Sequence, residues 1–322
     1  MLKRTFIIFF LLLSAVETTY CQETDNGPGF QLITHSNPAF SGSEGDGILR
    51  LSYLNYFPGN NYNLHSVYFS YDSYFPSLHG GAGIYLSNDY AGGIMNDVRG
   101  GLSYSYFLQA GKDFYINAGL SASLYHRGFN FSGAILPDQI DPLGSAVLTS
   151  GETLISEGHT AFDVDAGFLA IYKSFFCGVA VNHLAEPGIS VNGSPDDKLK
   201  RKIILHFSGD FYLGRGDELV LRPQLFSSAQ GGLLTIGGGA VFESKYLSFN
   251  SMMFGNNENT VNIQTGFGVR SGRLSVFYNY RFNIISGNSM MPVSLLHQTG
   301  VAFSLNNVDK RNIIKTINFP KM

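Results

Sequence analysis

Apolar and small polar residues alternate through fourteen stretches of this chain, between Ile48 and Leu305. From Val261 to Arg270, for example, odd-numbered positions are mostly apolar, and even-numbered positions carry Asn, Gln, Gly and Arg. Successive side chains of a strand point to opposite faces, so each stretch predicts a strand with one apolar and one polar face. We therefore expect an all-β chain.

The predicted strands are long enough to cross an outer membrane at a tilt, and their number is even, as in bacterial single-chain barrels. These features favour a transmembrane outer-membrane β-barrel of about 14 antiparallel strands. We expect the strands at 47–57, 63–75, 80–88, 98–109, 113–126, 161–172, 174–184, 201–213, 218–228, 232–242, 245–254, 261–271, 273–283 and 295–305.

The connections between these strands alternate in length. Every second one is a tight turn, whereas the others are mostly longer loops. Short turns at one end and long loops at the other are typical of the periplasmic and extracellular ends of a barrel. Both termini then lie in the periplasm. The tight turns are expected at 76–79, 110–112, 173, 214–216, 243–244 and 272, and the long loops include Asn88–Asp97, Arg127–Thr160, Ala185–Lys200 and Ile284–Ser294.

Alternation alone does not separate a membrane barrel from a soluble β-sandwich or propeller. The polar face decides between them, because it is rich in Ser, Gly, Asn and Gln, which suit a confined lumen. Charged residues make up 14% of the chain, against about a quarter in ordinary soluble domains. No propeller-like repeat stands out. The net charge of −3 and the lack of a basic stripe argue against nucleic-acid binding.

The first residues predict a secretory signal peptide over residues 1–21. Two basic residues precede the apolar run Phe6–Val16, and Thr19 and Cys21 occupy the −3 and −1 positions of a cleavage site. Lipidation of Cys21 is the alternative, which we disfavour because residues 18–20 lack the usual Leu and small residues. We divide the chain into the signal peptide, an N-terminal periplasmic or plug segment (22–46), the barrel (47–305) and a periplasmic C-terminal tail (306–322).

Residues that could carry chemistry are few. Cys177 is the only thiol of the mature chain, so no disulfide framework is possible, and we expect a small buried or lipid-facing hydrophobe there. An outer-membrane enzyme remains an alternative, because four histidines lie near serines. The sequence has no Gly-x-Ser-x-Gly elbow and no His-Glu-x-x-His pair, so we expect no catalytic residues, cofactor or metal. The four histidines are His126, His183, His206 and His297.

One pair of acidic residues lies within a predicted strand. Asp163 and Asp165 share a face, about 7 Å apart by strand rise, where they could bind a cation or accept an Arg from a neighbouring strand. We favour a lumen charge network, because buried carboxylates need partners. Its possible cations on the same parity are Arg99, Lys202, Arg270 and Arg281.

The C-terminal tail combines basic and apolar residues. It could dock a periplasmic partner or fill the lumen, and a disordered end is the alternative. The residues that we expect to dock are Lys310, Arg311, Lys315 and Phe319.

A short motif before the first strand consists of Asn37, Pro38, Ala39, Phe40 and Gly42. It resembles the start of the PorP/SprF family, outer-membrane proteins of the type IX secretion and gliding machinery of Bacteroidetes-type bacteria. One departure is the family's frequent Gly-Tyr-x-Tyr-Asp, which here ends in Arg281. Further similar segments, in the family's order, are 81–89, 104–106, 163–168, 176–184 and 314–320.

The resemblance implies a non-enzymatic role in secretion or surface attachment of cargo adhesins that carry C-terminal secretion domains. Outer-membrane lipid and periplasmic type IX components are the other implied partners. The loops Arg127–Thr160, which is acidic, and Ala185–Lys200 are the expected cargo-receiving surface. A passive porin or small-solute transporter is the alternative, because the lumen face is polar. In either case the lumen is open, or is filled by residues 22–46 and the tail.

Overall fold

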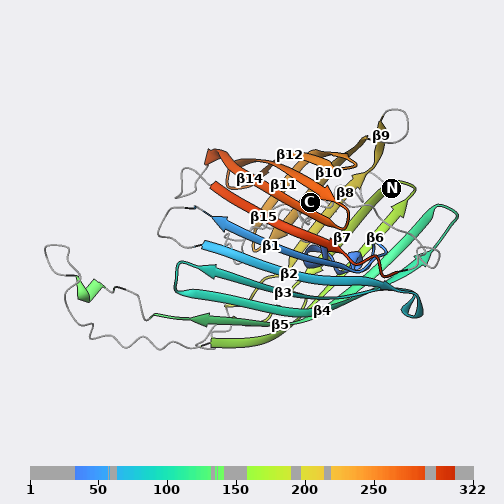
Figure 1. Cartoon of the computed structure of the whole chain (residues 1–322). Coiled ribbons are helices and arrows are strands. Elements are labelled where there is room, and N and C mark those ends of the chain that lie inside the picture. Colours follow the sequence, from blue (N-terminus) through green and yellow to red (C-terminus); the bar gives the residue numbers. More distant parts are fainter. Residues whose placement is uncertain are drawn as a thin grey trace, which may run out of the picture.

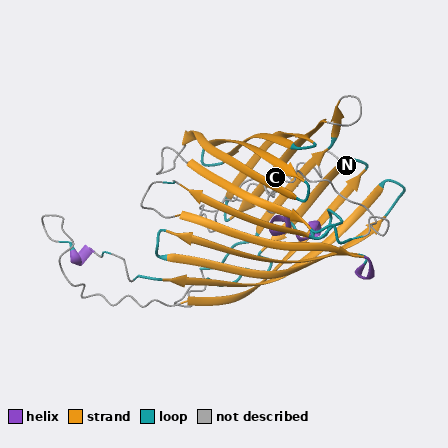
Figure 2. Cartoon of the chain, viewed as in Figure 1, coloured by secondary structure: helices purple, strands orange, loops and turns teal. Residues whose placement is uncertain are grey.

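The strands of this chain form one closed antiparallel barrel (Figure 1). The computed structural model describes residues 33–56, 58, 64–131, 135, 137–140, 158–189, 197–213, 219–286 and 295–308. The predicted signal peptide and docking tail lie outside these residues. Strands dominate the described part, with a few short helices (Figure 2). None of its helices is long and apolar enough to cross a membrane.

The barrel closes because β1 (Ile48–Tyr56) pairs with both β2 (Leu64–Phe75) and β15 (Leu295–Ser304). β8 (Lys202–Gly209) and β9 (Phe211–Leu213) pair with one neighbour, β10, and together make one interrupted strand. The predicted 14-stranded barrel is therefore confirmed. The other strands are β3 (Gly80–Ala91), β4 (Met95–Gln109), β5 (Phe114–Phe129), β6 (Gly158–Tyr172), β7 (Phe175–Asn182), β10 (Leu219–Gln230), β11 (Leu233–Ser244), β12 (Leu247–Asn256), β13 (Thr260–Ser271) and β14 (Leu274–Ser286).

The third connection differs from its prediction. β3 and β4 both extend past their predicted ends, so the expected long loop Asn88–Asp97 is wrong, and a turn of three residues replaces it. Gly92 and Gly93 have φ angles of 66° and 76°, which glycine adopts without steric penalty. Asp97, which looked like a loop residue, instead lies in a strand and pairs with Arg127.

The two faces of the wall follow the predicted parity. Leu120 and Leu124 of β5 are 61% and 59% exposed, whereas Ser121 and Ser123 between them are 3% exposed. The same alternation runs along the other strands, so the apolar rows face outward and the small polar rows face inward. This orientation is typical of a membrane barrel whose outer surface meets lipid.

Residues 33–46, which we call the inner segment, lie inside the barrel (Figure 1). They contain the short helices α2 (Ile33–Ser36) and η1 (Pro38–Phe40). Ala39 and Phe40 are at most 3% exposed. Residues that sequence reasoning assigned to the resemblance motif thus form part of the interior.

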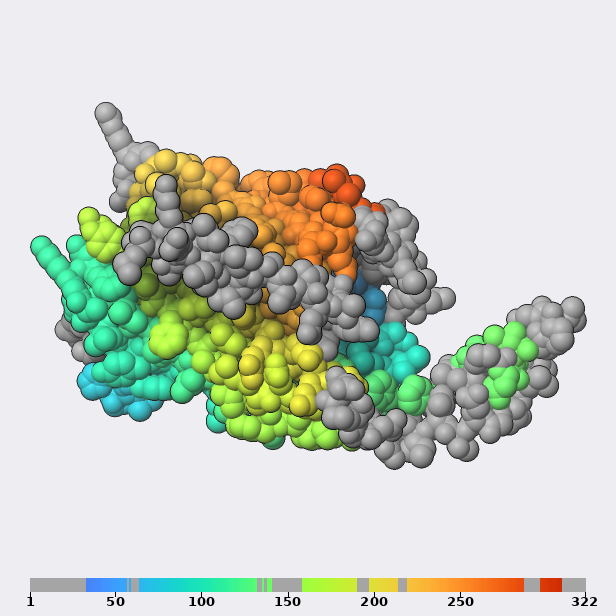
Figure 3. Space-filling model, turned by 180° about the vertical axis from the view of Figure 1, so that it is seen from behind, coloured from blue at the N-terminus to red at the C-terminus, as the bar shows by residue number. Residues whose placement is uncertain are grey.

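Two views show the rest of the arrangement. From behind, most of the lime and yellow atoms of the middle of the chain lie below the orange atoms near its end (Figure 3). The short helix η3 (Pro137–Gln139), in the connection between β5 and β6, stands apart from the barrel. That connection begins after Phe129 and ends before Gly158, and most of it lies outside the described residues.

Candidate functional site

The inner segment is fixed to the wall first through Asn37. Its side-chain oxygen accepts a hydrogen bond from the Ala39 amide at 2.9 Å, which caps η1. Its Nδ2 donates to the carbonyls of Phe168 and Val179, each at 3.4 Å, and lies 3.3 Å from His206 Nε2. One fully buried side chain therefore joins η1 to three strands, β6, β7 and β8.

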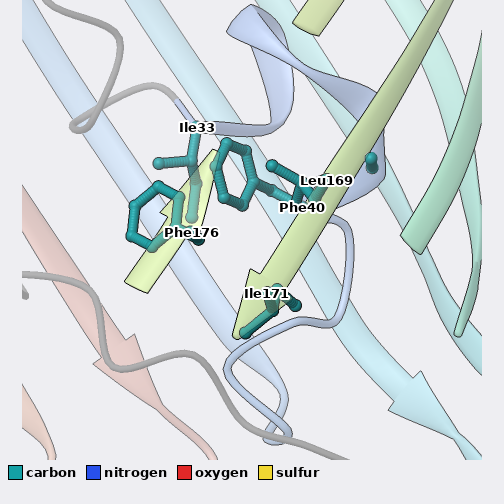
Figure 4. Close-up of a cluster of buried hydrophobic side chains, with 6 residues drawn as sticks. Ile33, Phe40, Leu169, Ile171 and Phe176 are labelled. Carbon is teal, nitrogen blue, oxygen red and sulfur yellow. The ribbon is translucent and has the colours of Figure 1, made fainter. Parts of the chain in front are cut away.

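An apolar cluster lies between the inner segment and the wall. Phe40 meets Phe176 of β7 edge to face, with ring centroids 5.7 Å apart. Ile33 of α2, Ala39 of η1, and Leu169 and Ile171 of β6 complete the buried cluster (Figure 4). Burial of a large apolar side chain stabilises by about 1.5–3 kcal/mol, so these contacts are a main source of docking energy.

Small residues lie in register across five neighbouring strands next to this segment, and all five are buried. A Cβ atom on Gly119 would overlap the Ala39 nitrogen, and one on Gly81 or Gly167 would overlap the inner segment as well. The wall therefore has space for the inner segment only because these side chains are absent or small. This small-residue band consists, from β3 to β7, of Gly81, Ser105, Gly119, Gly167 and Ala180.

Hydrogen bonds join the middle of the inner segment to β4. The Ser41 hydroxyl donates to Ser103 Oγ at 2.7 Å, and the Ser105 hydroxyl donates to the Ser41 carbonyl at 2.6 Å. Gly42 follows with a φ of 68°, in the left-handed region that favours glycine. Gly42, the last residue of the resemblance motif, is thus needed for a turn that lies against Ser73 of β2 and Gly81 of β3.

Ion pairs hold the same turn to β1 and β2. Arg50 pairs with both Glu44 of the inner segment and Asp72 of β2. Asp72 also accepts a hydrogen bond from the Gly42 amide at 2.8 Å. The three charged groups are at most 11% exposed at their side chains, and in such surroundings charges must be paired.

Asp46 ends the inner segment at the seam between β1 and β15. Its carboxylate accepts hydrogen bonds from the amides of Asn306 and Asn307, at 2.8 and 2.9 Å, and from Ser304 and Gly47. Partial burial alone would raise the pKa of Asp46, but these four hydrogen bonds outweigh it and lower that pKa below its ordinary value. The ionised form therefore joins the beginning of β1 to the end of β15.

A cluster of charged side chains lies inside the barrel beyond the small-residue band. Nη2 of Arg99 is 3.1 Å from Asp163 and 2.8 Å from Asp165, and His183 Nδ1 is 2.6 Å from Asp163. We call these four residues the charge layer. Asp163, Asp165 and His183 offer ligand atoms close enough together for a metal ion. The Arg99 guanidinium contacts both carboxylates, so the arrangement is that of an ion-pair network.

The other predicted cations lie on different strands and have other partners. Arg270 of β13 pairs with Glu243. Arg281 of β14 hydrogen-bonds Gln264 at 3.2 Å, and its guanidinium carbon lies 4.7 Å from the centre of the Phe254 ring. Lys202 begins β8. Of the predicted network, the structure brings together Arg99, Asp163 and Asp165.

The connection between β7 and β8 folds toward the interior. Ile189 and Leu199 are 3% and 0% exposed and pack with Tyr125 of β5. Leu199 donates its amide to the Pro187 carbonyl at 2.9 Å. We use the name β7–β8 connection for its described residues, 183–189 and 197–201. The part of the predicted loop that the structure describes is thus partly buried, which sequence reasoning did not foresee.

The other three candidate histidines each contact a neighbouring side chain, and Cys177 lies on the barrel wall. His126 Nδ1 lies 2.8 Å from the Thr160 hydroxyl, and His297 Nδ1 lies 2.6 Å from the Tyr278 hydroxyl. His206 packs against Phe40, whereas Cys177 is exposed on the outer face. His183, in contrast, is fully buried.

Comparison with known families decides the identity of this barrel. Residues 31–293 match the family model described as type IX secretion system membrane protein PorP/SprF. The chain belongs to the PorP/SprF family. It is therefore an outer-membrane barrel of type IX secretion, and the resemblance carried by its N-terminal motif is confirmed. A comparison with curated protein sequences gives no match.

Solved structures resemble this PorP/SprF chain in fold alone. A mutant of the monoaromatic hydrocarbon channel TodX matches with a TM-score of 0.53 and 11% identity, over 92% of this chain and 98% of that one. The P. putida toluene transporter TodX matches with a TM-score of 0.50 and 11% identity, over 85% and 93%. Omp33 of Acinetobacter baumannii has a TM-score of 0.46 at 10% identity, over 82% and 100%.

Several contacts of this PorP/SprF interior were missed from the sequence. Glycines on an otherwise polar inward row, such as Gly119 and Gly167, signal close approach of another backbone. Arg50 and Asp72 share the inward parity of their strands, so they were also detectable as charges in need of partners. The seam contacts of Asp46 have no sequence signal, because they join residues more than 250 positions apart.

Proposed function

We propose that this chain supports the secretion or surface attachment of cargo adhesins as a non-enzymatic outer-membrane component of type IX secretion. Membership of the PorP/SprF family identifies type IX secretion as the machinery. The observation that carries the proposal is the packed inner segment, since it occupies space that a diffusion pore would need. The barrel then serves as a frame, and its two ends are the working surfaces.

The packing of the interior supports this interpretation on both sides of the barrel. In the half next to the inner segment, Ala39 and Asn37 are fully buried. In the opposite half, Asn250, Gln264 and Asn279 are fully buried as well. A water-filled channel exposes its lining side chains, and these side chains are not exposed.

The two ends have different expected partners. We propose that the end with the loops lies outside the cell and receives cargo, through the connection after β5 and the β7–β8 connection. The other end, with both termini, then meets periplasmic type IX components. Most of the connection after β5, and the docking residues Lys310, Arg311, Lys315 and Phe319, lie outside the described residues.

A loop deletion tests the cargo assignment. Removing residues 132–156 should leave the barrel folded and abolish display of adhesins on the surface of cells that have lost the native gene. The measurement is antibody labelling of intact cells, with folding checked by the heat-dependent gel shift of the barrel. Replacing the short turn Gly231–Gly232 at the same end with Asn-Gly is the matched control and should leave display intact. Unaltered display after the loop deletion would contradict the assignment.

A porin or small-solute transporter is the second candidate, favoured by the polar inward rows of every strand. Single-channel conductance in a planar bilayer separates the two functions. We expect the wild-type protein to conduct little, because the inner segment and the buried amides fill the interior. Stable open channels of porin-like conductance would favour the transporter. Lipid hydrolysis by the same preparation would contradict the non-enzymatic assignment.

A further inference from the structure

We propose that the charge layer couples the β7–β8 connection to the inner segment, so that displacement of one loosens the other across the barrel. The inference deepens the proposed function, because it makes the packing of the inner segment depend on the cargo-receiving end. It rests on that function only for the assignment of cargo as the partner that contacts the β7–β8 connection. Three groups of contacts carry it, centred on His183, on Arg99 and on Tyr85.

The outer group is centred on His183. Its backbone amide donates to Asp165 at 3.0 Å, its ring nitrogen meets Asp163 at 2.6 Å, and it is fully buried. The φ of His183 is 58°, and the next residue, Leu184, donates to the Val164 carbonyl at 2.9 Å. A left-handed backbone is unfavourable for a residue other than glycine. The contacts to the two aspartates therefore hold the β7–β8 connection in its inward position.

Arg99 forms the central group. Its Nη2 reaches both aspartates, its Nε donates to Ser123 at 3.1 Å, and its guanidinium carbon lies 5.7 Å from the centre of the Tyr85 ring. The wall leaves space for this ring, because a Cβ atom on Gly101 would meet Tyr85 at 2.7 Å. Any shift of Arg99 must therefore move Tyr85 or lose its contact with it.

The inner group connects Tyr85 to the inner segment. The His35 ring lies edge-on to Tyr85, with centroids 6.0 Å apart, and also to Tyr68 at 5.8 Å. Thr34 Oγ1 is 2.7 Å from the Tyr68 hydroxyl. A second link passes through the backbone of β7, because Asn182, which donates a hydrogen bond to the His35 carbonyl at 3.3 Å, directly precedes His183. The inner segment and the β7–β8 connection are thus joined through Tyr85, Arg99 and the two aspartates.

The balance of charge makes the position of Arg99 sensitive to the position of His183. Asp163 and Asp165 are nearly inaccessible to solvent and share the Arg99 guanidinium and the His183 contacts. Buried charges that lose a partner must find another or become hydrated. When the β7–β8 connection moves outward with His183, Arg99 must therefore rearrange and disturb the packing of Tyr85 against His35. Thermodynamic linkage requires the reverse effect to be equal.

The test uses a reporter cysteine on the inner segment. Ser43 is fully buried, so Ser43→Cys reacts with a membrane-impermeant maleimide only when the inner segment loosens. The native cysteines, Cys21 and Cys177, are changed to Ser. His183→Asn removes the imidazole contact but tolerates the left-handed backbone. We expect this variant to raise the labelling rate of purified full-length protein by about tenfold, within the range common for coupled sites.

A matched control breaks an ion pair on the other side of the barrel. Asp210 is 2.5 Å from Arg222, which is 2% exposed. We expect Asp210→Asn to leave the labelling rate of Ser43→Cys unchanged. An equal rate in the two variants, with both barrels folded, would overturn the proposal.

The reverse direction needs no change in the charge layer, so it holds even where His183→Asn does not fold. Ser41→Cys with Ser103→Cys places two thiols where hydroxyl oxygens now lie 2.7 Å apart, and their disulfide fixes the inner segment to β4. Hydrogen exchange of residues 183–189 should slow several-fold in the oxidised protein relative to the same protein after reduction. No difference would refute the coupling. Because neither arm uses cargo, its failure is distinct from loss of display after the loop deletion.

Discussion

The half of the barrel formed by β1 to β8 and the half formed by β10 to β15 are filled by different means. In the first, small inward residues make space for a separate stretch of chain, the inner segment. In the second, long polar side chains of the wall itself meet one another. Asn250 donates to Asn279 at 2.9 Å, which reaches Gln298, and Arg281 reaches Gln264.

This difference shows which part of the interior is able to change. Side chains such as Asn279 are attached to the strands and stay inside as long as the barrel is folded. The inner segment is attached only at Asp46, next to the start of β1, and is otherwise held by noncovalent contacts. We therefore expect the side of the small-residue band to open more easily than the opposite half.

The largest expected effect comes from filling that band. Gly119→Leu should displace the inner segment, because even a Cβ atom there would overlap the Ala39 backbone. The burial of Phe40 and Ile33 is then lost, at about 1.5–3 kcal/mol for each side chain. We expect a loss of about 3–6 kcal/mol in the free energy of unfolding in urea, together with fast labelling of Ser43→Cys.

The control for this prediction is a leucine on the opposite face. A Cβ atom on Gly100 of β4 would make only ordinary contact, at 3.6 Å, with Leu86. Gly100→Leu should therefore leave both the unfolding free energy and the labelling rate close to wild type. If the two leucine variants behaved alike, the small-residue band would have no special role in docking.

Much of this fold follows from local sequence patterns. The period of two fixed the faces of strands such as β5 and β13, because side-chain direction is a property of each strand alone. The third connection was misjudged for a local reason too. The polar residues near Asn88 and Asp97 were expected to form a loop, but they extend β3 and β4 of the barrel wall. Gly92 and Gly93 make the turn between these two strands.

The contacts of the candidate site depend instead on register. Gly81, Gly119 and Gly167 are far apart in the sequence and become neighbours only through the pairing of β3 to β6. Likewise, the parity of Asp163 predicted an inward cation but did not choose Arg99 among four candidates. That choice depends on which inward residues the strand register places at the same level along the barrel axis.

An intermediate effect is expected from the opposite half. Asn279→Ala removes hydrogen bonds to Asn250 and Gln298, both of which are nearly inaccessible to solvent. Leaving such groups unsatisfied costs about 1–3 kcal/mol, which urea unfolding would detect. Labelling of Ser43→Cys should stay at the wild-type rate, because no described hydrogen bond joins Asn279 to the inner segment. Faster labelling would show that the two halves are filled as one unit.

The smallest effect is expected at the seam where the halves meet. The pKa of Asp46 is lower in the folded chain than its ordinary value, so the unfolded chain binds the proton more readily. The stabilisation is therefore complete above the unfolded pKa of about 3.9 and is lost as the pH falls through the lower folded pKa.

Asp46→Asn should remove this pH-dependent part of the stability and change little else. The measurement is the urea midpoint of wild type and variant between neutral pH and pH 3. We expect the two midpoints to converge at the acid end, with a difference at neutral pH smaller than that caused by Asn279→Ala. The effect is small because Asp46 is only partly buried and its backbone donors at Asn306 and Asn307 can bind water instead. A difference that persisted unchanged to pH 3 would mean that the ionised carboxylate does not hold the seam.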